Sequence, residues 1–534
     1  MDRKKRMIKY YYIVCAMLTF TSIFLLRYKI VIGIKNAFFN KEVSSLNLTH
    51  DEKMADFEEF YSNIIKSVPL LDDQAKMYGI SFKDRKDYYI ELIEKTQDDY
   101  EFFCTMAAIE EDIPSFHTDI CFPLYSNISN LGGYNVEKIL CGTNFKSITE
   151  YWYKCIGNAY VRFSEVQRTN FKYIDGEYLF DAPYSSEQYQ NFQGYTLVSI
   201  DGKRINDYVV SNVSTYKIYY DYVRDIPYRW YLTLNDRVGE KVKVTLKDSD
   251  GNTINTELYF DFQIEVIDAF SYYYEDDATE SKGSSIYYYS DFENGIGYVD
   301  IENFLNSNGK ELEKILKSMG DFDNIVIDLR GNYGGYRKYA QRYLYQAIYS
   351  DDVETTLNWF IPSSDLNKII NNNLKNKLFY QSSSDKDGCN YSRKYIYRGK
   401  AADNKQSVYY LIDRGTASAA DGYVAMIKEN KLGTLIGSNT SGEGIADSYC
   451  CDSLKNSGLV YIYSPSLSYN QNGTNNSIYG TSPDIYTEQT KDSFYLQREM
   501  QAARKDINLY TEMLKYDTAL IKTIEIIQQK SNLH

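Results

Sequence analysis

Histidine is the scarcest titratable residue in this chain of 534 residues. Only His50, His117 and the terminal His534 are present, so any imidazole chemistry has to use one of these three side chains. They lie far apart in the sequence, and neither an H-E-x-x-H motif nor an aspartate-rich calcium loop occurs. We therefore expect neither a metal site nor a cofactor.

Cysteine and basic residues are also in short supply. Seven of the eight cysteines lie beyond the first 30 residues, and no C-x-x-C pair occurs; this argues against a disulfide framework and against a zinc site, although one or two bridges outside the cell remain an alternative. The 59 Lys and Arg against 73 Asp and Glu give a net charge of −14. A chain with this balance has no basic stripe to neutralise phosphates, which excludes nucleic acid as a partner.

Apolar and aromatic residues are abundant. Hydrophobic residues make up 43% of the chain and aromatic residues 16%, with 56 tyrosines. This composition supports a substantial buried core and excludes global disorder. At roughly 150 residues per domain, the length predicts two to four domains.

The N-terminus predicts a membrane anchor. A basic cluster at residues 3–9 precedes an uncharged run at 10–26, which Arg27 and Lys29 close. A run of this length is at the short end of what spans a bilayer, and the positive-inside rule keeps the basic end in the cytoplasm. We expect a signal anchor over 1–35, a single pass through the cell membrane, and an extracytoplasmic catalytic domain. A cleaved signal peptide and a buried core helix are the alternatives.

Residues 50–115 predict a small helical domain. Apolar residues recur at three and four positions from Met54 to Val68, where Pro69 ends the helix. A later helix follows Thr96, which with Asp99 resembles a capping box. A linking segment at 116–184 follows this domain and carries His117.

The remaining chain predicts three further regions. Residues 185–265 alternate with a period of two around Asp-Gly turns, which favours a PDZ-like domain; any other small β-barrel is the alternative. From about 280 to 490, strands alternate with helices, as in an α/β domain with a mostly parallel sheet. Three buried strands are expected there, at 297–301, 324–329 and 407–413. Residues 491–534 predict a C-terminal helix.

A turn of tiny residues is the strongest chemical signal. The strand at 407–413 runs into Arg-Gly-Thr-Ala-Ser-Ala-Ala-Asp at 414–421 and then into a helix. A serine at the start of such a helix lies beside free backbone amides that stabilise an oxyanion, so Ser418 is a candidate nucleophile. The alternative is that Thr416 or Ser418 merely caps the helix.

A glycine-rich turn follows a second buried strand. Residues 328–335 read Asp-Leu-Arg-Gly-Asn-Tyr-Gly-Gly and come directly after the strand expected at 324–329. Glycines allow the backbone to approach a ligand and to point amides at it, and two such turns at one sheet edge predict a site there. A glycine-rich crossover loop without function is the alternative.

Four motifs in order resemble one family. DLRGNYGG at 328–335, TASAAD at 416–421, GSNTSGEG at 437–444 and YGTSPDI at 479–485 are similar to the motif series of the C-terminal processing (tail-specific) serine peptidases. The resemblance covers roughly residues 50–490. It implies an α/β fold with a crotonase/ClpP-like catalytic domain, an N-terminal helical domain and an embedded PDZ-like domain. It also implies Ser418 as nucleophile and an oxyanion hole from the amides of Ala419 and of Gly334 or Gly335.

The family divides on the base that activates the serine. One branch uses a lysine at the position where this chain has Glu443, so that lysine is missing here. The other branch, which resembles tricorn protease, uses a histidine in a pattern ending His-Thr, and this chain has Ser-Phe-His-Thr at 115–118. The resemblance therefore implies His117 as the base. That branch usually orients the base with a glutamate, whose place Ser477 occupies, so we expect Ser477 or Glu443 to orient His117.

These features predict a membrane-anchored extracytoplasmic serine endopeptidase that acts on protein or peptide tails. The main alternative is a catalytically impaired peptidase fold that binds peptides through its PDZ-like domain, because the lysine and the usual glutamate are both missing. Acyl transfer on a crotonase-like fold is a third possibility. The sequence carries no indication of the oligomeric state.

Overall fold

The structure of the chain is a computed structural model. It describes residues 46–113, 115, 117–121, 147–152, 154–155, 171–181, 187–214, 217–232, 241–259, 286–304, 309–371, 381–384, 386–401, 406–443, 449–502 and 509–532. The expected anchor over residues 1–35 lies outside this part. Within the described part, no helix combines the length and the apolar character needed to cross a bilayer.

The N-terminal region is helical, as the sequence predicts. Thr49 caps its first helix in a capping box with Glu52, and Phe57, Phe60 and Ile64 are completely buried. Each such side chain contributes about 1.5–3 kcal/mol when it is fully buried. The helices of this region are α2 (His50–Ser67), α3 (Leu71–Tyr78), η1 (Lys83–Arg85), α4 (Lys86–Lys95) and α5 (Asp99–Glu110).

The expected cap of α5 is wrong by two residues. Asp98, not Thr96, accepts the hydrogen bond from the amide of Glu101. The Thr96 hydroxyl instead donates to the carbonyl of Ile93 at the end of the preceding helix. A carboxylate is the better acceptor for free amides at a helix start.

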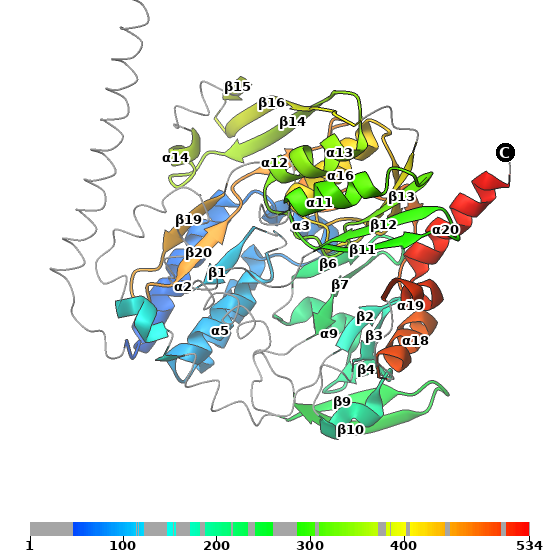
Figure 1. The fold of residues 1–534 in the computed structure, drawn as a ribbon. Helices are drawn as coiled ribbons and strands as arrows, with labels where there is room; N and C mark the ends of the chain where they lie inside the picture. Colours follow the sequence, from blue (N-terminus) through cyan, green and yellow to red (C-terminus); the bar gives the residue numbers. More distant parts are fainter. Residues whose placement is uncertain are drawn as a thin grey trace, which may run out of the picture.

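A six-stranded sheet forms the centre of the α/β domain (Figure 1). Its order is β11-β12-β13-β17-β18-β22, and all neighbours are parallel except β11 with β12. Because both faces of the sheet are covered, its inner strands are continuously apolar. The strands are β11 (Ile286–Asp291), β12 (Ile296–Ile301), β13 (Asn324–Asp328), β17 (Ser407–Ile412), β18 (Thr434–Gly437) and β22 (Ile485–Tyr486).

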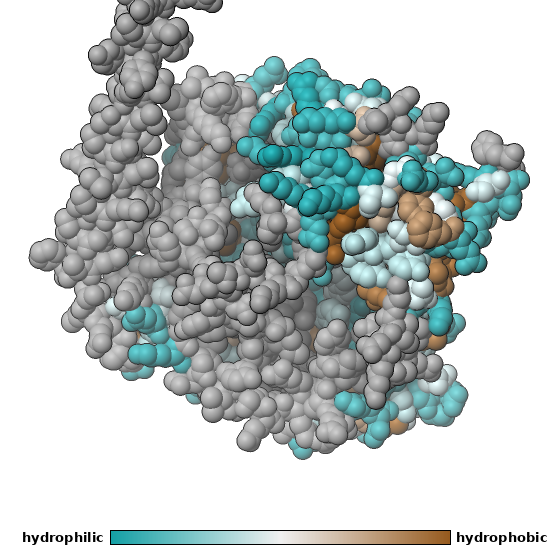
Figure 2. Space-filling model, in the orientation of Figure 1, coloured by the Kyte–Doolittle hydropathy of each residue, from teal (hydrophilic) through white to brown (hydrophobic). Residues whose placement is uncertain are grey.

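Helices cover this sheet on two sides. One hydrophobic core packs β13 and β17 against helices that include α11 (Gly309–Ser318) and α16 (Ala419–Glu429). Another packs the opposite face against α19 (Leu509–Tyr516) and α20 (Thr518–Ser531). Leu312, Ile315 and Leu316 bury one side of α11, and Figure 2 shows hydrophilic side chains on the outer surface over α11 to α13. The described helices that lie between β12 and β22 in the sequence are α11 (Gly309–Ser318), α12 (Arg337–Tyr339), the π-helix η6 (Ala340–Tyr345), α13 (Gln346–Ile348), α14 (Lys368–Asn371), α16 (Ala419–Glu429) and α17 (Asn476–Tyr479).

Two smaller sheets join the α/β domain to the helical region. A four-stranded sheet has the order β15-β16-β14-β21, and a three-stranded sheet has the order β1-β20-β19. Phe60 of α2 packs edge-on against Tyr461 of β20 at 5.6 Å between ring centres. The strands are β1 (Asp119–Cys121), β14 (Val353–Pro362), β15 (Gln381–Ser384), β16 (Gly388–Tyr397), β19 (Cys450–Ser453), β20 (Val460–Tyr463) and β21 (Leu467–Tyr469).

The β domain is a seven-stranded sheet with one separate hairpin. The sheet has the order β10-β9-β4-β3-β2-β8, with β5 paired to β4, and β6 and β7 form the hairpin. It begins at Phe171, so part of the expected linking segment 116–184 belongs to it. Its elements are β2 (Phe171–Ile174), β3 (Glu177–Phe180), η3 (Glu187–Phe192), β4 (Thr196–Ile200), β5 (Lys203–Arg204), α9 (Ile205–Ser211), β6 (Ile218–Asp221), β7 (Ile226–Arg229), β8 (Tyr231–Leu232), β9 (Lys241–Lys247) and β10 (Thr253–Tyr259).

The C-terminal region differs from the single helix expected over 491–534. Its described residues, 491–502 and 509–532, form three helices, α18 (Lys491–Ala502), α19 (Leu509–Tyr516) and α20 (Thr518–Ser531). Asp517 separates the last two because its backbone is extended and its carboxylate caps the amides of Ala519 and Leu520. The same carboxylate binds the guanidinium of Arg330 at 2.7 and 2.9 Å, which ties α20 to the carboxyl end of β13.

Candidate active site

Ser418 stands on a strained turn between β17 and α16. Its φ of 51° lies in the left-handed region, which is unfavourable for a residue with a side chain. Two hydrogen bonds fix this turn to the turn that follows β13. The Thr416 hydroxyl donates to the carbonyl of Leu329 at 2.7 Å, and the Ala417 amide donates to the carbonyl of Asn332 at 2.9 Å. The Ser418 hydroxyl makes no capping hydrogen bond to α16, so it does not act as a helix cap.

His117, which follows the N-terminal helical region in the sequence, lies next to Ser418. Its Nε2 lies 3.0 Å from the Ser418 Oγ, although 301 residues separate the two. The short strand β1 starts two residues after His117 and pairs with β20 of the α/β domain, Asp119 opposite Ile462. This pairing brings the histidine from the end of the helical region to Ser418.

Glu443 binds the opposite side of the imidazole. Its Oε2 lies 2.8 Å from Nδ1 of His117 and accepts a second hydrogen bond from the His117 amide at 3.1 Å. The carboxylate is only 3% exposed. An acceptor at Nδ1 holds the ring proton there and leaves Nε2 free to accept the proton of Ser418. The three side chains therefore form a continuous Ser-His-Glu arrangement.

The turn that carries Glu443 is fixed directly to the nucleophile turn. Gly442 forms a parallel bridge with Ala417, and its carbonyl accepts a hydrogen bond from the Ser418 amide at 3.0 Å. A Cβ on Gly442 would lie 2.1 Å from the carbonyl oxygen of Asn476, so only glycine fits. Glu443 itself has a φ of 59°, which directs its carboxylate to the histidine from a conformation that side chains rarely adopt.

Ser477 does not contact the imidazole. Its hydroxyl accepts a hydrogen bond from the Ser468 amide at 2.9 Å and shares another with the Ser468 hydroxyl at 2.7 Å. The side chain is buried in the contact between α17 and β21. Of the two acceptors expected from the sequence, the structure places Glu443, and not Ser477, on His117.

Asp421 connects three parts of the site and was missed at the sequence level. It lies in the first turn of α16 and is completely buried. Its Oδ1 accepts hydrogen bonds from the hydroxyls of Thr440 at 2.5 Å and Thr481 at 2.7 Å. Its Oδ2 accepts a hydrogen bond from the side-chain amide of Asn476 at 2.9 Å. The only local signal was an aspartate at the end of a run of tiny residues, and its three partners lie far away in sequence.

The amides expected to stabilise an oxyanion are adjacent to Ser418. A Cβ on Gly334 would lie 2.8 Å from both the Ala419 nitrogen and the Ser418 Cβ, so the glycine turn packs directly on the nucleophile turn. The Gly334 amide donates to the Asn332 side chain at 2.9 Å. No described residue accepts from the amides of Gly335 and Ala419. These two amides are therefore the available donors, and Gly334 supplies the close packing.

Tyr449 covers the imidazole. Its ring is parallel to that of His117, with 6.4 Å between the ring centres and 17° between the planes. Burial raises the pKa of the Tyr449 hydroxyl to about 12, so the hydroxyl is neutral near pH 7. Among the described residues, no group of His, Cys, Asp and Glu side chains is arranged to hold a metal ion.

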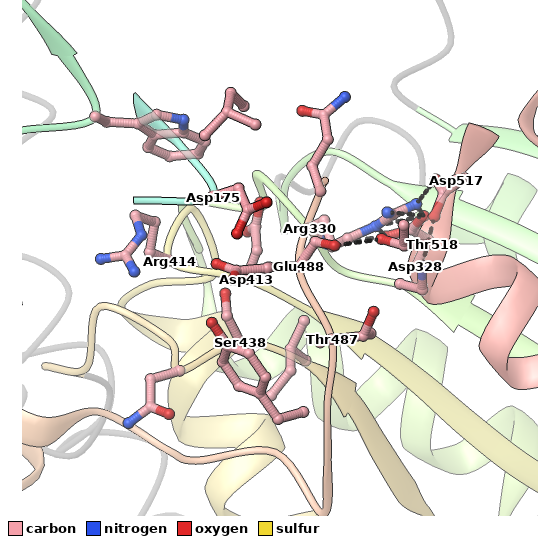
Figure 3. A pocket seen from close by; sticks show the side chains of 18 of the residues that line it. Asp175, Asp328, Arg330, Asp413, Arg414, Ser438, Thr487, Glu488, Asp517 and Thr518 are labelled. Atoms are coloured by element: carbon pink, nitrogen blue, oxygen red, sulfur yellow. Dashed lines mark hydrogen bonds and ion pairs between the residues drawn. The ribbon is translucent and has the colours of Figure 1, made fainter. Parts of the chain in front are cut away.

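A cavity of about 440 Å³ lies at the carboxyl ends of the parallel strands (Figure 3). Asp328, Arg330 and Asp517 form a hydrogen-bonded group on one side of it, and Arg414 lies on the opposite side. Burial raises the pKa of Asp300 in its wall to about 8, and the charge of Asp328 adds to this shift. The cavity is lined by the β domain, the α/β sheet and the C-terminal helices.

Residues 295–487 match the model of peptidase family S41, which confirms the resemblance indicated by the motifs. The structure of mature CPAF complexed with lactacystin is similar, with 12% identity, a TM-score of 0.51, and coverage of 90% of this chain and 99% of that chain. Mature CPAF alone gives 13% identity, a TM-score of 0.50, and coverage of 83% and 94%. These two structures show a shared fold. No curated protein matches the sequence significantly.

Proposed function

We propose, from the match of residues 295–487 to the peptidase family S41 model, that the chain is a membrane-anchored extracytoplasmic serine endopeptidase that cleaves protein or peptide tails. The observation that carries the proposal is the Ser418–His117–Glu443 chain of contacts at 3.0 and 2.8 Å. A serine, a base within hydrogen-bond reach and a buried carboxylate behind that base are what acyl transfer to serine requires.

The residues have separate roles in the proposed reaction. Ser418 Oγ attacks the carbonyl carbon of the scissile peptide bond while His117 Nε2 takes its proton. The resulting oxyanion accepts hydrogen bonds from the amides of Gly335 and Ala419. When the carbon–nitrogen bond breaks, His117 gives the proton to the leaving amine and an acyl-enzyme remains. A water molecule that loses a proton to His117 then attacks the acyl carbon. The bond between that carbon and Ser418 Oγ breaks, the acid leaves, and His117 returns the proton to Ser418.

The β domain supports tails as the substrate class. PDZ-like domains bind an extended peptide end as an additional strand and capture its terminal carboxylate. The test is hydrolysis of one peptide with a free C-terminus and of the same peptide amidated there. We expect the wild type to cleave the free form faster, and Ser418→Ala to cleave neither. Equal cleavage of both forms would contradict tail recognition while leaving the peptidase assignment intact.

The location rests on the N-terminal sequence. The basic cluster at 3–9 and the uncharged run at 10–26 support a cytoplasmic N-terminus and an exported catalytic domain. The proposed location can be tested with a C-terminal tag. Protease is added to intact cells from which any outer envelope has been removed, and digestion of the tag is measured. A tag that becomes accessible only after lysis of the membrane would contradict the location.

A peptide-binding protein without activity is the second candidate, since Ser477 occupies the place where the related branch has a glutamate. The position of Glu443 on His117 weighs against it. Intact peptide after long incubation with the wild type, together with measurable binding of the same peptide, would support this second candidate.

A further inference from the structure

One hairpin of the β domain contacts both halves of the active site. It consists of β6 and β7, which pair antiparallel from Ile218 opposite Arg229 to Asp221 opposite Ile226. Figure 1 shows the two strands in the middle of the molecule, apart from the larger sheet of the same domain. His117 and Ser418 come from segments 301 residues apart in the sequence. An element that contacts both segments can therefore influence the distance between the two side chains.

Lys217 connects the start of this hairpin to the segment that carries the base. Its ammonium donates to the Thr118 carbonyl at 3.0 Å and to Glu110 at 2.7 Å, and it lies 3.3 Å from a Glu111 oxygen. Thr118 follows His117 directly. The lysine side chain is 13% exposed and that of Glu110 is 2% exposed. Burial opposes the charge of Lys217, but the two glutamates raise its pKa nevertheless, so it stays an ammonium that binds this carbonyl.

The other strand of the hairpin is held to the same region by a second ion pair. Arg229 at the end of β7 lies 2.5 Å from a carboxylate oxygen of Asp112, and both side chains are completely buried. Arg85 binds the second oxygen of Asp112 at 2.6 Å. A buried pair of this kind is costly to break, because the remaining partner loses a charged contact that water does not replace. The hairpin is therefore fixed to the residues just before His117.

Arg414 connects the hairpin to the nucleophile turn. Its guanidinium lies 4.3 Å from the ring centre of Tyr228 and 5.1 Å from that of Tyr219, one ring from each strand. Arg414 precedes Ser418 by four residues, and its carbonyl accepts a hydrogen bond from Ser441 near the Glu443 turn. A guanidinium is attracted to the face of an aromatic ring, and more strongly where water is excluded.

We propose that the β6–β7 hairpin sets the distance between His117 and Ser418, and that Lys217 is the positioning residue through which it acts on the base. This inference rests on the proposed function and adds a requirement to it. In the native arrangement, Lys217 fixes the carbonyl next to the histidine while Tyr228 and Tyr219 hold the loop next to the serine. Lys217 itself does not touch the reacting atoms.

The main test is Lys217→Met, which keeps most of the aliphatic side chain and removes the ammonium. We expect the rate of Ser418 labelling by a fluorophosphonate, and kcat for a peptide, to fall by about 10- to 100-fold, because misplacement of a base by about 1 Å has this effect. KM should stay within about two-fold, since substrate contacts are not altered.

Lys217→Arg should recover part of the rate. Lys247→Met, on a lysine of the same domain paired with Glu177, is the matched control and should label like the wild type.

A second variant separates positioning from loss of stability. Lys217→Met leaves the nearly completely buried Glu110 without its ammonium partner, whereas Lys217→Met combined with Glu110→Gln removes the ammonium and the more buried of its two carboxylates. We expect the double variant to melt closer to the wild type and still to label slowly. Wild-type labelling in either variant would overturn the inference.

A spectroscopic readout decides the inference even if the wild type is not labelled, which would contradict the proposed function. With only three histidines in the chain, the ring signals of His117 can be assigned in a ¹⁵N-histidine spectrum by their absence in His117→Ala. We expect these signals to shift in Lys217→Met and to keep their wild-type positions in Lys247→Met. Unchanged His117 signals in Lys217→Met would overturn the inference.

Discussion

Glu443 accepts two hydrogen bonds from His117 on one carboxylate oxygen, from the ring Nδ1 at 2.8 Å and from the backbone amide at 3.1 Å. The first bond sets the position of the ring proton, and the second fixes the backbone that carries the ring. This double contact places a carboxylate on His117, although Ser477 stands where the related branch has a glutamate. It comes from the turn where the lysine-using branch of the family has its base.

Replacement of Glu443 by glutamine tests its role. Glutamine keeps the shape but removes the negative charge that stabilises the protonated imidazole. We expect kcat to fall by up to about 10⁴-fold, as in related triads that lose the acid. Steady-state hydrolysis of a fluorogenic peptide measures this. A kcat within about three-fold of the wild type would show that Glu443 does not orient the base.

Ser477→Ala is the contrasting variant, because the serine hydroxyl binds Ser468 and not His117. We expect the folded protein to keep its kcat. Loss of the acceptor leaves the buried Ser468 amide unpaired, which costs about 1–3 kcal/mol of stability. Parallel kcat and melting measurements separate the two effects. If folded Ser477→Ala lost as much kcat as Glu443→Gln, this would show that Ser477 takes part in catalysis.

Alanine variants of two glycines in one turn test whether this turn packs directly on Ser418. Gly331 and Gly334 both have positive φ values, 70° and 100°, but a Cβ at Gly331 meets no atom within 4 Å whereas one at Gly334 meets the nucleophile turn at 2.8 Å. Both alanine variants are therefore strained, at about 1 kcal/mol or slightly more. Only Gly334→Ala should also displace Ser418 and abolish labelling by an active-site probe. Equal labelling of the two variants would contradict the close contact.

Asp300 predicts a pH dependence of stability. Burial raises its pKa to about 8 in the folded chain, whereas an unfolded aspartate has a pKa near 3.9. The folded chain thus keeps a proton that the unfolded chain releases, so this contribution to stability is present below about pH 4 and is lost as the pH rises to about 8. Urea unfolding of the wild type and Asp300→Asn across this range measures it. The variant should lose less stability with rising pH; identical slopes would contradict the assignment.

The sequence predicted the elements whose signal is local. The strands expected at 297–301, 324–329 and 407–413 correspond to β12, β13 and β17 within one residue at each end, because each is a short, continuously apolar run. The helix start at Ser418 was visible from the tiny residues around it. The α/β class, and the glycine turn beside the nucleophile, follow from the same local patterns.

Features that depend on distant contacts were not visible in the sequence. The choice of Glu443 over Ser477 depends on a positive φ at Glu443 and on the bonds of Asp421 to Thr440, Asn476 and Thr481. The strands β2 and β3 were missed because they are four residues long and contain charged residues. The break before α20 occurs at Asp517, whose carboxylate caps α20 and also binds Arg330, which is distant in the sequence.

Covalent labelling of Ser418 tests the central claim most directly. A fluorophosphonate reacts only with a serine whose proton a nearby base removes. We predict a single adduct on the wild type, identified at Ser418 by peptide mass spectrometry, and no adduct on Ser418→Ala or on a folded His117→Ala protein. Equal labelling of the wild type and Ser418→Ala, or undiminished labelling of His117→Ala, would contradict the assignment of Ser418 and His117 as nucleophile and base.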